Sequence, residues 1–124
     1  MSWTRVNLRE LPDSGDENLE SRFGRRPLAT EHLGVSYFRY APGHRVETGH
    51  AHRVQEEVYI VVGGSGRLRL DDDVLELRPW DAVRVGQGVF RAFEGGPDGL
   101  EVIAVGSDRP PAGDVEHLQD WWPR

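Results

Sequence analysis

The stretch GHAHRVQEEVYIVVGGSG, residues 49–66, carries the strongest structural signal in the chain. Residues 57–62 form an almost unbroken apolar run, which is typical of a strand buried on both faces or nearly so. The glycine-rich segment 63–66 is predicted to turn the chain into a second strand at 67–70. The centre of the sequence therefore predicts β-structure.

Other short strands are predicted on both sides of this stretch. The aromatic and β-branched residues 34–40 form one strand, which Ala41-Pro42-Gly43 ends. Asp71-Asp72-Asp73 is the tip of a hairpin, because apolar and polar residues alternate on both of its flanks. Three further strands are predicted at 81–85, 89–93 and 100–105. Evenly spaced short strands favour an all-β fold, here an antiparallel barrel of two packed sheets.

The length of 124 residues predicts one domain in three parts. These parts are an N-terminal arm at 1–33, a barrel at 34–105 and a C-terminal tail at 106–124. The arm is polar, with a short helical turn expected at 17–23. The tail holds Trp121 and Trp122, which we expect to pack on the barrel or on a partner subunit, because large aromatic residues rarely stay uncovered.

Composition narrows the function classes. The net charge of −6 argues against a nucleic-acid partner, so we interpret the small basic cluster of Arg22, Arg25 and Arg26 as a solvated surface. No apolar run approaches the ~20 residues needed to span a bilayer, and the first residues lack a signal-peptide core, so a cytoplasmic location without membrane contact is expected. The chain has no cysteine, so any metal must be held by histidine and carboxylate side chains.

His50 and His52 are the first candidates for such a site. At positions i and i+2 of a strand, their imidazoles share one face and can bind one metal ion. A histidine pair by itself is more often structural, but here Glu57 and Gly64 follow. The pattern H-x-H-x4-E-x6-G resembles the first motif of the cupin superfamily.

A second stretch, residues 80–91, resembles the second cupin motif, a Gly-Asp turn followed by a P-x-G-x-x-H strand pair. It departs from that motif at several positions: Trp80 stands where the family has glycine, Gly86 where it has proline, Arg91 where it has a metal-binding histidine, and Gly95 where it often has asparagine. The resemblance covers about residues 34–105. It implies a small single-domain cupin of the cupin 2 type, an antiparallel double-stranded β-helix or jelly-roll barrel.

The resemblance also implies a divalent metal ion, Fe, Mn, Ni or Zn, held by His50, His52 and Glu57. Arg91 cannot be the fourth ligand, because its guanidinium stays protonated and has no free lone pair. Strand parity leaves Glu56 as the rival of Glu57 unless residues 53–56 bend. Three further residues could complete the metal shell: His44, Glu47 and Gln55.

Three roles are open for Arg91: it clamps a substrate carboxylate or phosphate, it pairs with Glu57 and replaces the metal, or it points out of the barrel. Tyr59 shares the face of Glu57 and either offers its hydroxyl to a ligand or is a core aromatic.

Two functions follow from these alternatives. One is a metal-dependent enzyme acting on a small acidic or carbonyl-containing metabolite; similar cupins include dioxygenases, isomerases and polyketide cyclases. The other is a non-catalytic barrel that binds a small anion without metal. Exposed strand edges and the aromatic tail also predict a homodimer.

Overall fold

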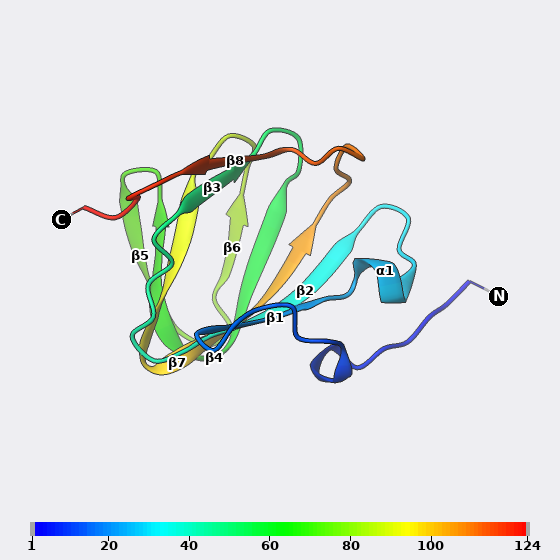
Figure 1. The fold of residues 1–124 in the computed structure, drawn as a ribbon, viewed down its shortest axis with the longest axis horizontal. Helices are drawn as coiled ribbons and strands as arrows, with labels where there is room; N and C mark the ends of the chain where they lie inside the picture. Colours follow the sequence, from blue (N-terminus) through cyan, green and yellow to red (C-terminus); the bar gives the residue numbers. More distant parts are fainter. Residues whose placement is uncertain (1, 124) are drawn as a thin grey trace.

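The fold is an antiparallel β-barrel, seen in a computed structural model that describes residues 2–123 (Figure 1). Its elements, in chain order, are the 3-10 helix η1 (Leu8–Glu10), β1 (Leu19–Phe23), α1 (Arg25–Leu28), β2 (Gly34–Tyr40), β3 (Gly49–His52), β4 (Glu57–Leu70), β5 (Asp73–Leu77), β6 (Ala82–Val85), β7 (Arg91–Gly106) and β8 (Val115–Leu118). The all-β fold predicted from the sequence is confirmed.

β7 is the central strand of the barrel. It pairs antiparallel with β2, β3 and β4, while β1 extends the sheet beyond β2 and β8 extends it beyond β3. β4 also pairs with β5 and β6. The core lies inside this curled sheet and is formed by alternating inward residues of β4 and β7, among them Val61, Leu68, Leu100 and Val102.

The turn expected at residues 63–66 is wrong: β4 runs unbroken from Glu57 to Leu70. Its register with β7 shifts twice in this segment, as at a β-bulge. Gly64 has a φ of 71°, and a Cβ there would lie 2.0 Å from the Gly99 carbonyl oxygen. The glycines therefore allow a bulged strand to approach its neighbour closely, which needs the same backbone freedom as a turn.

The strand break expected at residues 95–99 is wrong for the same reason. β7 is continuous from Arg91 to Gly106 and faces the bulged part of β4 across Gly66↔Gly95 and Gly64↔Leu100. The hairpin predicted around the three aspartates is confirmed, with Leu70 paired to Asp73.

The two flanking segments also take part in the sheet. Residues 19–23 form strand β1 instead of the expected helical turn, because all five of them pair with residues of β2. The tail packs on the barrel of its own chain: Trp122 is only 6% exposed and donates from Nε1 to the Val46 carbonyl oxygen at 2.8 Å. The helices within residues 2–123 lack the length and apolarity of a membrane-spanning segment.

Candidate functional site

His50, His52 and Glu57 come together inside the barrel. The two histidines lie on β3, and Glu57 is the first residue of β4. Residues 53–56 leave the strand conformation between them, which gives the bend that parity requires. One ligand atom from each of the three side chains lies within 4.8 Å of the others.

The rival carboxylate, Glu56, lies outside this group. Its side chain is on the surface and accepts a hydrogen bond from Nε of Arg84 at 2.5 Å. Of the three residues considered as additional ligands, His44 and Glu47 do not line the barrel cavity. Gln55 does line it, but its amide nitrogen donates to the Ser107 carbonyl oxygen at 3.1 Å.

Arg91 lies behind Glu57 and is fully buried, with 0% of its surface exposed. Its guanidinium donates to Glu57 Oε1, to the Tyr59 hydroxyl at 3.0 Å and to the Val89 carbonyl oxygen at 3.0 Å. Among the described residues that line the cavity, Arg91 is not included. In this structure Arg91 therefore pairs with Glu57, which is one of the three roles left open for it.

Tyr59 has the features of a core aromatic and also lines the cavity, while its role toward a ligand stays a prediction. It is 3% exposed and packs edge-on against Phe93, as a core aromatic does. It also lines the cavity, and its hydroxyl donates to Glu57 Oε1 at 2.7 Å. The hydroxyl thus links Arg91 to Glu57, because it accepts from the first and donates to the second.

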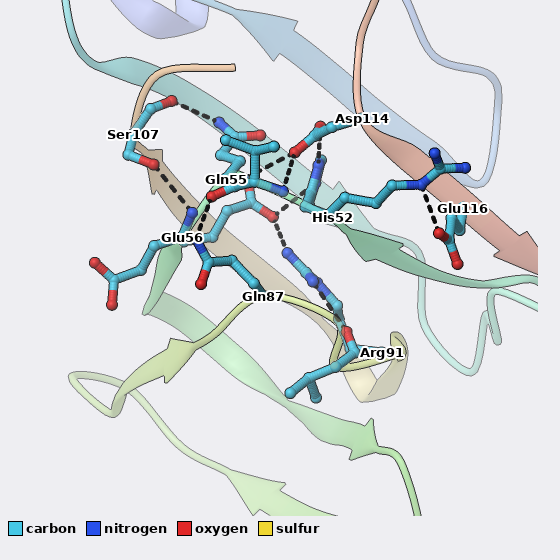
Figure 2. Close-up of polar contacts among 12 residues, drawn as sticks. His52, Gln55, Glu56, Gln87, Arg91, Ser107, Asp114 and Glu116 are labelled. Atoms are coloured by element: carbon cyan, nitrogen blue, oxygen red, sulfur yellow. Dashed lines mark hydrogen bonds and ion pairs between the residues drawn. The ribbon is translucent and has the colours of Figure 1, made fainter. Parts of the chain in front are cut away.

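Asp114, in the tail just before β8, is a site residue that the sequence analysis missed. Its Oδ1 lies 2.8 Å from His52 Nδ1, and its Oδ2 accepts from the backbone amides of Val54 and Gln55 at 3.0 and 2.8 Å (Figure 2). It therefore fixes both the ring of His52 and the bend after β3. Asp114 is 62 residues from His52, so no local motif could have identified it.

The surroundings of the two histidines push their pKa values apart. Burial and the nearby charge of Arg91 lower the pKa of His50 to about 4. For His52, burial opposes charging, but hydrogen bonds to Glu57 and Asp114 outweigh it and raise the pKa. The two imidazoles, whose ring centroids lie 5.3 Å apart, are therefore biased in opposite directions, His50 toward the neutral form and His52 toward the cationic form.

The carboxylates of Glu57 and Asp114 are held ionised by the groups that surround them. Burial alone would raise the pKa of Glu57, but hydrogen bonds from His52 and Tyr59 and the charge of Arg91 lower it to about 2. The pKa of Asp114 also falls to about 2, because the hydrogen bonds from His52 and two backbone amides outweigh its burial. Burial, followed by the charge of Glu57, raises the pKa of Tyr59, which keeps its hydroxyl protonated.

A cavity of about 920 Å³ opens beside this cluster. His50, His52, Glu57 and Tyr59 contribute its polar wall, and residues such as Phe38 contribute an apolar one. Within this wall, a neutral His50 can accept a hydrogen bond, whereas both ring nitrogens of His52 already face carboxylates. The site is therefore suited to a small molecule with both polar and apolar parts.

The donor set is compatible with a divalent cation, because two imidazoles and a carboxylate converge as they do in three-ligand metal sites. The guanidinium of Arg91 is not compatible with it. A cation bound here would share Glu57 with a permanent positive charge in a buried setting, where like charges repel strongly. Without metal, the carboxylates of Glu57 and Asp114 already have His52 and Arg91 as partners.

Comparison with known proteins agrees with this fold. The family described as Cupin domain matches residues 36–105, more than half of the chain. The chain therefore belongs to the cupin family. A search of curated protein sequences found no significant match.

Several solved cupin structures have the same fold. KdgF from a Halomonas species is 17% identical with a TM-score of 0.74, and the match covers 90% of this chain and 98% of that one. A Streptomyces PAC13 variant with uridine is 15% identical with a TM-score of 0.79, covering 98% and 95%. Oxalate decarboxylase of Lactobacillus farciminis, in a formate complex, is 19% identical with a TM-score of 0.76, covering 87% and 33%. These identities establish a shared fold only.

Proposed function

We propose that this cupin barrel binds a small acidic or carbonyl-containing metabolite and that Arg91 replaces the resident metal of the site. The observation that carries the proposal is the full burial of the Arg91 guanidinium against Glu57. A buried permanent cation stabilises the ionised carboxylate, which a metal ion would otherwise do. Structural neighbours with uridine or formate support a small-molecule ligand for the cavity.

A second candidate is a metal-dependent enzyme that uses the same residues. The convergence of ligand atoms from His50, His52 and Glu57 within 4.8 Å favours it. A bound divalent ion would polarise a carbonyl or activate oxygen. For this function Arg91 would have to give up its contact with Glu57.

Elemental analysis of the purified protein separates the two candidates. We expect no stoichiometric metal in the parent, even after addition of Fe, Mn, Ni or Zn. Arg91→His supplies an imidazole at the position of the missing ligand and is expected to gain about one metal per chain. Adding His50→Ala to that variant should abolish the gain, with circular dichroism checking the fold of each protein. One equivalent of metal in the parent, lost in His50→Ala, would instead establish the metal-dependent candidate.

The homodimer and the cytoplasmic location stay proposals. For the homodimer, the structure removes one supporting observation and adds others. Trp122 is covered within its own chain, so the aromatic tail no longer calls for a partner. Two other tryptophans remain uncovered, Trp3 at 70% and Trp80 at 77% exposure, and β1 and β5 leave strand edges. Light scattering of the purified chain at several concentrations tests the dimer.

A further inference from the structure

Three arginines contribute to the wall of the cavity. Arg25 and Arg26 belong to α1, and Arg109 follows β7. In Figure 1, α1 and the orange segment after β7 lie on the same side of the molecule. A hydrogen bond joins these two regions, since Arg25 donates to the Ser107 carbonyl oxygen at 3.0 Å. The arginine cluster predicted to be a solvated surface therefore contributes two of its members to a cavity.

The charge of the cavity wall is opposite to that of the chain. The protein has 21 acidic and 15 basic residues, with a net charge of −6. Among the described lining residues, three are arginine, three are histidine, and the single carboxylate is Glu57. Glu57 is already paired with Arg91 and His52. The wall therefore presents uncompensated positive charge to whatever occupies the cavity.

No carboxylate within residues 2–123 forms an ion pair with Arg25, Arg26 or Arg109, whereas Arg45, Arg67 and other arginines outside the cavity do have such partners. The nearest acidic residue in the chain to Arg109, Asp108, instead binds the ring of His32 at 3.0 Å. Like charges that line one cavity repel each other, and an anion bound there would reduce that repulsion.

The arginines also stand next to the polar cluster. Ser107, which Arg25 contacts, accepts a second hydrogen bond from Gln55, and Gln55 is held by Asp114 beside His52. Figure 2 shows this chain of contacts from Ser107 to His52. An apolar wall that includes Phe23 and Phe38 completes the cavity. A ligand that fills the space therefore has a charged group, an apolar body and a polar end.

We propose that Arg25, Arg26 and Arg109 recognise the anionic group of an organic phosphate or carboxylate bound in this cavity. The inference rests on the proposed small-molecule function and adds its ligand class. Guanidinium groups suit both kinds of anion, because their planar donors match two oxygens at once. Arg91 cannot serve this purpose, since it is fully buried and is not among the residues that line the cavity.

The test measures binding of phenyl phosphate, benzoate and phenol by NMR titration, with chelator present to exclude metal effects. Phenol carries the apolar ring without the anion, and the two anionic probes distinguish phosphate from carboxylate. The test variant is Arg26→Gln with Arg109→Gln, which leaves the Arg25 contact to Ser107 intact. The control is Arg5→Gln with Arg39→Gln, which removes the same charge from exposed residues outside the cavity.

We expect an anionic probe to bind the parent more tightly than phenol and to shift resonances of cavity residues. Its dissociation constant should rise about tenfold in the test variant, because two exposed cations of the cavity wall are lost. The constant for phenol should stay within about twofold, and the control should match the parent. Phenol binding in the cavity with no gain from the anion would overturn the arginine site while leaving a small-molecule cavity. Equal loss in test variant and control would also overturn it.

Discussion

Removing the buried cation is the most direct perturbation of the cluster. In Arg91→Met the side chain keeps much of its volume, but Glu57 loses its guanidinium partner inside the barrel. Breaking a buried ion pair from one side typically costs 3–5 kcal/mol. Glu57 keeps its contacts with His52 and Tyr59, so the lower end applies, and we expect a loss of about 3 kcal/mol in unfolding free energy.

A double-mutant cycle with Glu57→Gln isolates the pair. Urea denaturation at pH 7 with chelator present gives the unfolding free energy of the parent, both single variants and the double variant. Since the double variant leaves no unpaired buried charge, it should be more stable than the sum of the single losses predicts, by about 2 kcal/mol. Strictly additive losses, or a cost below about 1 kcal/mol for Arg91→Met, would refute the buried pair.

Three further predictions concern other parts of the chain. Trp80 has a φ of 75°, so Trp80→Gly should be more stable than Trp80→Ala by about 1 kcal/mol in thermal or urea unfolding, because alanine keeps the strained Cβ. Asp114→Asn should cost about 2 kcal/mol, since a charged hydrogen bond to His52 is lost, whereas Asp72→Asn, at an exposed turn, should cost little. Burial opposes ionisation of Glu94, but hydrogen bonds from two arginines outweigh it and lower the Glu94 pKa. The ionised Glu94 should therefore stabilise the fold by about 1 kcal/mol above pH 4.5, and this contribution should vanish on acidification. The unfolding free energies of Glu94→Gln and of the parent should accordingly converge at low pH.

The strands that the sequence predicted correctly are those with a local pattern. Residues 34–40 and 57–62 have apolar, aromatic or β-branched side chains at the spacing of a strand, and that property does not depend on distant contacts. The glycines of residues 63–66 and 95–99 were misread as turns. A bulge and a turn ask for the same residue type, and the choice between them depends on the partner strand, which the local sequence does not contain.

Trp80 shows a different limit. Where the resemblance has glycine, the structure has a left-handed backbone, which explains why glycine suits that position. The sequence marked Trp80 as a departure from the motif but gave no conformation. Its exposure of 77% means that the large side chain adds little packing to offset the strain.

The candidate site likewise contains residues that a local sequence pattern predicts and residues whose place depends on distant contacts. The spacing of the motif predicted that His50, His52 and Glu57 lie together, and strand parity predicted the bend at residues 53–56. Asp114 and the arginines on α1 and after β7 depend on how the two ends of the chain fold back over the barrel, so their place could not be derived from spacing. Arg91 falls between these two cases. The sequence predicted three alternative roles for it, and the choice of the pair with Glu57 comes from the structure alone.

The charge arrangement connects these observations. In a metal site, one cation both balances the carboxylate and attracts an anionic ligand. Here Arg91 supplies the balance but is sealed behind Glu57 and Tyr59, so it cannot also contact a ligand. If the cavity takes an acidic molecule, the attraction has to come from cations that face the open space. Arg25, Arg26 and Arg109 are in that position, which is why the two functions of one metal ion would be carried here by separate arginines.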